Sequence, residues 1–261
     1  MFNSLKYIAL LLLAITMFSC SDDDTNPVKD TDEITLNSIV NKTSGDYTFD
    51  VLSEGTELEE GHNVFYIRAT DNSGNSIAND ISVNLMMDMG MMMHSTPFMT
   101  EVVTMNDKEY IKVDATFIMA SAGGTWFLTL KSETMNIDER IDYTVTATGN
   151  VKRFIFDEKS YFVTLRSLDS PKVGINDFIV SIHTRESMMI HPAVTDLTTE
   201  VEMLMPSMGH GSDGNVSPVH TENGVYAGKV NFNMTGDWQI TLKLKRGDIM
   251  IGEPIVYTLD F

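Results

Sequence analysis

Short stretches in which apolar and polar residues alternate run along the chain from about Ile34 to its end. Alternation with a period of two places every second side chain on the same face, which is typical of a half-buried β-strand. Gly, Asn, Asp and Ser separate these stretches, and no segment after the first twenty residues has a convincing helical period. The stretches in the first part of the chain are 47–51, 63–68, 81–85, 110–115, 126–131 and 142–146. The pattern predicts an all-β fold built from antiparallel sandwiches of immunoglobulin-like type.

The pattern repeats after roughly 113 residues, which is too long for a solenoid repeat and fits two tandem domains. The matched segments are 61–65 with 174–178 and 124–131 with 236–243. Each copy holds one tryptophan, which we expect at the centre of its sandwich core. We therefore predict one β-sandwich over residues 34–148 and a second over residues 149–261.

The start of the chain has the pattern of an export signal. Lys6 precedes an apolar run over residues 7–18, and Cys20, the only cysteine in the chain, follows shortly after. The run is too short to span a bilayer comfortably as a mature helix. Residues 17–20 resemble a bacterial lipoprotein signal, which implies removal of residues 1–19 and lipidation of Cys20.

Residues 20–33 have few apolar side chains, so they cannot bury a core and are expected to form a polar tether. The acidic run at 22–24 resembles the export signal of surface lipoproteins of Bacteroidetes, although an ordinary solvated linker has the same composition. Ser21, rather than an aspartate, follows the lipidated cysteine and favours the outer membrane. We expect a lipid-anchored protein on the cell surface, with a periplasm-facing position as the alternative.

Composition excludes several classes of function. The chain has 18 Lys and Arg against 37 Asp and Glu, a net charge of −19, so its surface repels nucleic acid. With its single cysteine committed to lipid, the mature chain can form no internal disulfide and no cysteine-based catalytic or metal site. It also lacks a Gly-x-Ser-x-Gly elbow, a His-Glu-x-x-His motif and a phosphate-binding loop, and we expect no enzymatic activity.

A Met-x-x-Met-x-His spacing occurs twice in the chain. The residues are Met205, Met208 and His210 in the second copy, and Met89, Met92 and His94 in the first. Thioether sulfur and imidazole nitrogen together suit a soft ion, and Cu(I) is the expected one. The alternative is that the methionines fill the sandwich core while the histidine hydrogen-bonds a carbonyl.

The second spacing lies at the end of a predicted strand. In an extended strand, Met203 and Met205 share one face, and Pro206 stops the ladder of hydrogen bonds. Met203 is therefore expected in the core. Met208 and His210 would follow on a glycine-rich loop that lets both side chains turn back towards Met205.

Other methionines and histidines offer further possibilities. Eight methionines fall between Met86 and Met105, more than one core needs, so some form an exposed soft-metal surface, partner surface or oxidant trap. His183 and His191, with two methionines between them, form a second possible ligand set, although His191-Pro192 also has the sequence of a turn. The two remaining histidines, His62 and His220, are expected in exposed loops.

A family resemblance is carried by five short motifs in order. They are 201–211, Pro218, 224–226, 232–234 and 236–238. Together they resemble the YtkA-like domain, a small β-sandwich relative of the FixH family, over about residues 178–244. The first copy resembles a degraded version of the same domain. The resemblance implies an association with copper handling, but membership of a family alone does not establish metal binding.

Taken together, the sequence predicts an envelope lipoprotein that binds Cu(I) and passes it on through one Met/His site in each domain. Its partners would be outer-membrane lipid, through Cys20, and a copper-handling or other envelope protein. The competing hypothesis is a non-catalytic structural or adhesion module that binds an envelope protein or a glycan.

Overall fold

The computed structural model describes residues 34–261, which form twenty β-strands and two short 3-10 helices. The export signal, Cys20 and the polar tether lie outside the described residues. No helix within the described part of the chain is long and apolar enough to cross a lipid bilayer.

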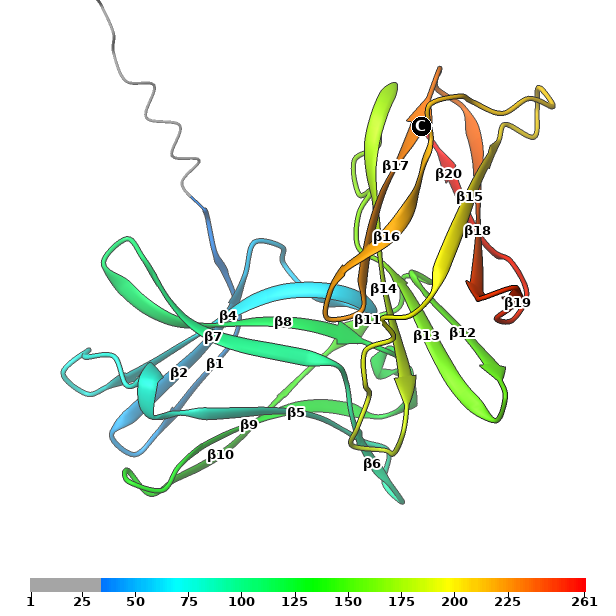
Figure 1. The fold of residues 1–261 in the computed structure, drawn as a ribbon. Coiled ribbons are helices and arrows are strands. Elements are labelled where there is room, and N and C mark those ends of the chain that lie inside the picture. The colour runs from blue at the N-terminus through cyan, green and yellow to red at the C-terminus, as the bar shows by residue number, and fades with distance from the viewer. Residues whose placement is uncertain (1–33) are drawn as a thin grey trace, which may run out of the picture. The chain divides into compact units, whose positions relative to one another are not determined.

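The first half, residues 34–148, contains two main antiparallel sheets (Figure 1). The five-stranded sheet has the order β1 (Asn37–Ser44), β2 (Tyr47–Ser53), β4 (Gly61–Asp71), β8 (Lys108–Phe117) and β7 (Phe98–Met105). The four-stranded sheet has the order β10 (Ile137–Tyr143), β9 (Thr125–Ser132), β5 (Ser82–Asp88) and β6 (Met93–Ser95). The short elements are the parallel pair β3 (Leu58–Glu59) and β11 (Val145–Thr146), and the helices η1 (Ala78–Asp80) and η2 (Ser121–Gly123).

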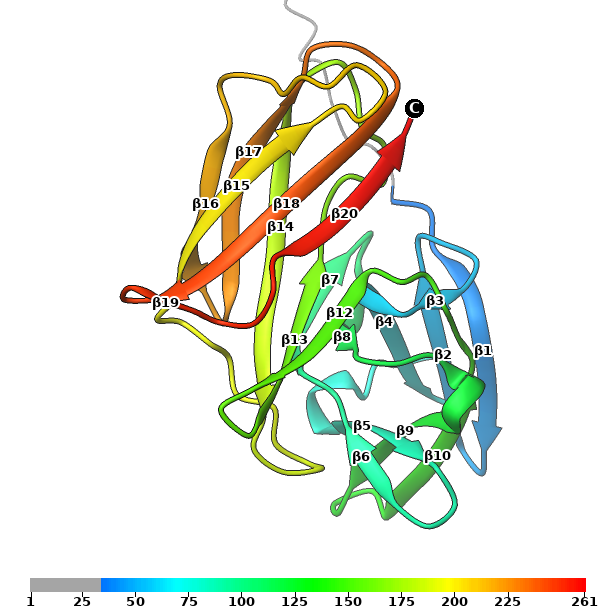
Figure 2. The ribbon, with the colours of Figure 1, turned by 90° about the vertical axis from the view of Figure 1, so that its right-hand side faces the viewer.

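The second half, residues 149–261, also contains two sheets, both antiparallel (Figure 2). Its five-stranded sheet has the order β12 (Val151–Phe156), β13 (Lys159–Leu165), β14 (Gly174–Arg185), β17 (Val225–Phe232) and β16 (Val216–Glu222). In its other sheet β18 (Asp237–Arg246) pairs with β15 (Thr198–Leu204), β19 (Ile249–Met250) and β20 (Ile255–Asp260).

The two halves follow one pattern of strand pairing. In both five-stranded sheets the first three strands in sequence are neighbours, and the last two then join in reverse order. In both smaller sheets the strand that carries the tryptophan, β9 or β18, lies between its partners. The predicted all-β fold is confirmed, and the repeat read from the sequence recurs in the topology. The boundary near residue 148 stays a prediction, because residues Thr35–Phe261 form one compact unit.

Each half buries its own hydrophobic core between its two sheets. One cluster of buried side chains comes from residues 49–145, and the other comes from residues 161–257. Trp126 and Trp238 are almost completely buried at these two cores, as the sequence predicts. Met203 is also buried, on the face of β15 opposite the exposed Leu204, which confirms the alternation expected for that strand.

Gly124, just before β9, lies very close to the backbone at the end of β5. A Cβ atom at this position would lie 2.4 Å from the backbone carbonyl oxygen of Asp88, although the extended backbone of Gly124 suits any residue. Gly124→Ala should therefore lower the free energy of unfolding by about 1–3 kcal/mol, because β5 must move away from β9.

Urea unfolding followed by tryptophan fluorescence measures this effect. Gly55→Ala is the matched control, since its Cβ would meet no atom closer than 3.6 Å and its φ is not positive. Equal unfolding midpoints for Gly124→Ala and Gly55→Ala would contradict the close approach of β5 and β9.

Candidate functional site

A tight turn, the second-half Met/His turn (residues 205–210), follows the end of β15. The backbone N–H of Met205 donates to the carbonyl of His210 at 2.7 Å, so these two residues form a single antiparallel bridge. The N–H groups of Met208 and Gly209 both donate back to the Met205 carbonyl, at 3.1 and 2.8 Å. Gly209 has a φ of +68°, a conformation that glycine adopts without strain. The predicted glycine-rich bend is therefore present, and its backbone is closed by hydrogen bonds.

The imidazole of His210 has a defined orientation at the end of this turn. Its Nδ1 lies 2.9 Å from the carbonyl oxygen of Gly211. A carbonyl can only accept a hydrogen bond, so Nδ1 is the donor, and in the neutral ring Nε2 keeps its lone pair. The ring lies edge-on to Trp238, with 6.3 Å between the ring centroids. The arrangement presents Nε2 as a ready metal ligand, because metal-bound histidine characteristically donates its other N–H to a carbonyl or carboxylate.

The first half repeats the arrangement in the first-half Met/His turn (residues 87–94). Met87 and His94 are paired across β5 and β6, as Met205 and His210 are paired in the second half. The His94 Nδ1 lies 2.8 Å from the carbonyl oxygen of Ser95, and its ring lies edge-on to Trp126 at 5.4 Å. The Nε2 atom of His94 is buried and has no hydrogen-bond partner among residues 34–261.

The structure aligns the two turns differently from the sequence spacing. Met87 lies opposite Trp126 on β9, and continuing the register of β15 by one residue places Met205 opposite Trp238. The residue equivalent to Met205 is therefore Met87, and Met89 lies in the loop. Counting residues back from the histidine does not identify equivalent methionines, because the loop between the paired methionine and histidine is two residues longer in the first half. Strand pairing with the tryptophan-bearing strand does identify them.

The tryptophan under each turn also fixes a second methionine. The Nε1–H of Trp126 donates to the carbonyl of Met119, and that of Trp238 donates to the carbonyl of Met234, both at 2.9 Å. In the first half, a Cβ built on Gly123 would lie 2.5 Å from the methyl carbon of Met119 and 3.7 Å from that of Met87. The methyl ends of these two methionines therefore lie close to one point. The sequence spacing missed Met87 and Met119, although their places relative to the tryptophan could have identified them.

The predicted methionine ligands divide into buried and exposed positions. Met205 is buried in the second core below the turn. Its methyl group packs directly against Gly236, where a Cβ would lie only 2.3 Å away. Met208 is 58 % exposed on the turn, and Met89 and Met92 are exposed on the longer loop. The prediction that part of the methionine cluster is exposed is confirmed, since Met91 is fully exposed.

The two histidines differ in their access to solvent. His210 is partly exposed, whereas His94 is only 3 % exposed, and burial lowers its pKa despite the opposing hydrogen bond to the Ser95 carbonyl. The segment after β14 covers this end of the first half. Ser95 donates its N–H to the Met188 carbonyl at 2.9 Å and its hydroxyl to the Met189 carbonyl at 2.8 Å. His94 is therefore neutral at pH 7 and closed in, while His210 can be reached from outside.

The histidines that sequence reasoning assigned to loops lie on strands. His62 is on β4 and lies between Asp114 and Arg166, and His220 is on β16 with its ring edge-on to Tyr226 at 5.3 Å. The sequence expectation of exposed loops was wrong because both residues occupy polar positions on strands that other side chains cover. His183 lies on β14, and the chain turns at residues 186–190, before His191-Pro192; the Thr184 N–H then donates to the Pro192 carbonyl at 3.0 Å.

Conventional metal donors do not gather at either turn. Within residues 34–261, no group of three or more His, Cys, Asp or Glu side chains is arranged to hold a metal ion. A site at these turns would therefore use one imidazole with thioether sulfur. This donor set fits a soft monovalent ion and does not suit Mg²⁺, Ca²⁺ or a structural zinc.

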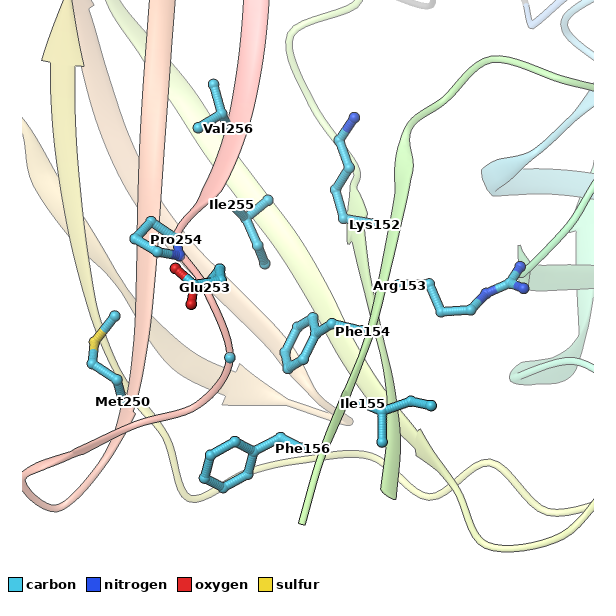
Figure 3. A pocket seen from close by; sticks show the side chains of 11 residues that line it. Lys152, Arg153, Phe154, Ile155, Phe156, Met250, Glu253, Pro254, Ile255 and Val256 are labelled. Atoms are coloured by element: carbon cyan, nitrogen blue, oxygen red, sulfur yellow. The ribbon is translucent and has the colours of Figure 1, made fainter. Parts of the chain in front are cut away.

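A separate groove of about 630 Å³ lies in the second half between β12 and the β19–β20 segment (Figure 3). The rings of Phe154 and Phe156 point towards Pro254, whereas Arg153 and Ile155 point away from the groove. The lining is mainly aliphatic and aromatic, with no nucleophile and general base in hydrogen-bond contact. Its chemistry suits an apolar binding partner better than a reaction.

The chain is similar to several solved structures at low identity. For surface layer protein SbsC, domains 4–9, the identity is 16 %, the TM-score is 0.30, and 86 % of this chain and 31 % of that chain are covered. For the endo-fucoidan hydrolase MfFcnA4 from glycoside hydrolase family 107, the identity is 9 % and the TM-score is 0.24, with 84 % of this chain and 29 % of that chain covered. For bovine butyrophilin the identity is 9 % and the TM-score is 0.22, with 78 % of this chain and 93 % of that chain covered. The chain thus spans about a third of the length of the first two, and likenesses at these TM-scores carry no statement about function.

Sequence comparison gives a more specific result for the second half. No curated protein matches the chain. A family model does match, over a segment that begins just after β12 and includes β15, the second-half Met/His turn and most of β18. Residues 157–243 are therefore similar to the YtkA-like family.

Proposed function

We propose that this protein binds Cu(I) and passes it on through the Met/His turn of each half, with the second-half turn as the accessible site. The observation that carries the proposal is the paired orientation of His94 and His210. In both, Nδ1 is hydrogen-bonded to the carbonyl of the next residue, which leaves Nε2 of the neutral ring with its lone pair. One such contact is common, but its recurrence beside a methionine and above a tryptophan in both halves indicates a built arrangement.

The donor set agrees with capture and release of a soft ion. His210 supplies the nitrogen, Met208 stands exposed on the same turn, and Met205 lies buried at its base. Thioether sulfur carries no proton in the physiological range, so acid competes with the metal only at the imidazole. The proposed donors are uncharged, and the carboxylate of Asp237 at this turn is engaged by the N–H and hydroxyl of Ser207. Uncharged soft donors favour a monovalent ion and its exchange with a partner.

The place of this function is part of the same proposal. Lipidation at Cys20 would hold the chain at the outer membrane, and the polar tether of residues 20–33 would separate the folded unit from the lipid. A surface position would let the turns meet metal outside the cell, and a periplasmic position would let them serve a copper-handling envelope protein. The YtkA-like match over residues 157–243 supports the choice of the second half as the working site.

A specific observation favours one alternative, a module that binds an extended polypeptide. In the first half, the outer strands β1 and β10 are joined by an ion pair between Lys42 and Glu139 at 2.7 Å. The corresponding outer strands of the second half, β12 and β20, instead flank the groove lined by Phe154 and Phe156. Unpaired edge strands beside an apolar groove can accept an added strand from a partner.

Substitution at the second-half turn separates the two functions. Met205→Leu with Met208→Leu nearly conserves side-chain volume, so the free energy of unfolding should change by less than about 1.5 kcal/mol. Loss of both sulfur atoms should nevertheless weaken Cu(I) binding, and His210→Ala should weaken it further because it removes the nitrogen donor. Anaerobic competition with a chromogenic Cu(I) chelator measures the affinity.

Met135→Leu provides the matched control. Met135 packs against the first core between β9 and β10, at the end of β9 away from the first-half Met/His turn. The changes Met89→Leu, Met92→Leu and His94→Ala in the first half should have smaller effects, since exposed Met91 and Met93 can replace lost sulfur donors. If the wild-type protein and the Met205→Leu, Met208→Leu variant give the same competition curve, the copper proposal for this turn fails and the binding module is preferred.

The anchor is tested separately, with Cys20→Ser. Removing the thiol removes the only attachment point for lipid that the sequence offers, so the variant should leave the membrane fraction as soluble protein or remain as precursor. Fractionation with a carbonate wash and immunoblotting measures the distribution, and Ser21→Ala is the control. A Cys20→Ser protein of mature size that still sediments with washed membranes would overturn the lipoprotein assignment.

A further inference from the structure

A second group of histidines lies away from both Met/His turns, in a cleft of about 200 Å³. The cleft belongs to the compact unit formed by Thr35–Phe261, and side chains from both halves line it. The lining residues that matter here are His183, His191, Met99, Asn223, Arg166 and Asp114.

The two imidazoles in this cleft have unsatisfied nitrogen atoms. The Nδ1 of His183 and both ring nitrogens of His191 are buried without a hydrogen-bond partner in the described part of the chain. His183 is 9 % exposed, and the edge of the His191 ring contacts Phe162, with 5.9 Å between the centroids. Buried polar atoms nearly always have a partner, because leaving one unpaired costs about 1–3 kcal/mol. Unpaired nitrogens lining one cleft therefore point to a ligand.

Electrostatics keep both rings neutral. Burial, together with neighbouring positive charge that includes a second histidine in each case, lowers the pKa of His183 to about 4 and that of His191 to about 4. At pH 7 each imidazole thus has one nitrogen with a free lone pair.

The carboxylate of the cleft is already neutralised. Asp114 accepts a hydrogen bond from Arg166 Nη2 at 2.8 Å, and its other oxygen lies 3.3 Å from His62 Nε2. Burial alone would raise the pKa of Asp114, but His62 and Arg166 outweigh it and hold the pKa below its ordinary value. Since Arg166 remains positive, a divalent cation entering the cleft would meet a guanidinium and no free anion. The donors available are uncharged.

We infer that this cleft binds one Cu(I) ion between His183 and His191, with the thioether of Met99 as the third donor at its rim. Met99 lines the cleft and is half-exposed, and its sulfur accepts a hydrogen bond from the Asn223 amide at 3.3 Å. Two neutral imidazoles and a thioether match the softness and the single charge of Cu(I). The inference takes the identity of the ion from the proposed function, but it uses none of the residues of the Met/His turns.

The test is a Cu(I) titration of the chain from Ser21 onward, which lacks the Cys20 thiol, against a chromogenic chelator, in a variant already carrying Met205→Leu, Met208→Leu and His210→Ala. Adding His183→Gln and His191→Gln should remove one bound equivalent of Cu(I), and Met99→Leu should weaken that equivalent without removing it. His220→Gln is the matched control, because His220 also has a buried, unpartnered Nε2 beside an aromatic ring but lies outside the cleft. Binding to the His220→Gln protein should be unchanged.

A second measurement needs no substitution at the cleft and guards against misfolded variants. Histidine ¹⁵N spectra of the wild-type chain should show the imidazole nitrogens of His183 and His191 shifting when Cu(I) is added, with those of His220 constant. Unchanged spectra for His183 and His191, or an unchanged Cu(I) stoichiometry in a folded His183→Gln, His191→Gln protein, would overturn the inference. If Cu(I) binding falls only when residues 205–210 are substituted, the proposed function is kept and the cleft of His183 and His191 is refuted as a second site.

Discussion

The buried indole beneath each Met/His turn is the interaction on which the candidate site depends. Trp126 and Trp238 fill the end of their cores, and each donates its N–H to the carbonyl of a nearby methionine. The same rings contact a core phenylalanine on one side and the site histidine on the other. An indole has one hydrogen-bond donor and a rigid ring. It therefore positions the backbone of the loop that carries Met119 or Met234 and, at the same time, the imidazole of His94 or His210.

The two halves use this common base in different ways. In the first half the histidine is sealed beneath the segment that carries Met188 and Met189, and a long methionine loop is exposed beside it. In the second half the turn is short, the histidine is partly open and one methionine stands at the surface. An ion at the second turn could exchange directly with a partner. An ion at His94 would require movement of the covering segment, so its release would be slower.

Sequence patterns were sufficient for the fold and for the strand register of the second site. Alternation predicted the long central strands β2, β4, β5, β8 and β9 of the first half. Met203 and Met205 lie on the buried face of β15 and its continuation as the period of two requires. In the first half, Met87 rather than Met89 is paired with His94, because loop length is not fixed by hydrophobic pattern while strand pairing is.

The clustering of His183 and His191 with Met99 could not be predicted from sequence. It depends on how residues almost a hundred positions apart approach one another within the compact unit, and no local period encodes that approach. The hydrogen bond from each histidine to a carbonyl was expected from sequence only under the alternative in which the methionines fill the core, and the buried Met205 also agrees with that alternative.

The tautomer of these two histidines tests the account most directly. Long-range ¹H–¹⁵N correlation spectra of the apo-protein at pH 7 distinguish a protonated from an unprotonated ring nitrogen. We predict that His210 and His94 both carry their proton on Nδ1, and that one equivalent of Cu(I) shifts the Nε2 resonance of His210 first. A proton on Nε2 of His210, or an Nε2 resonance that does not respond to Cu(I), would contradict the account.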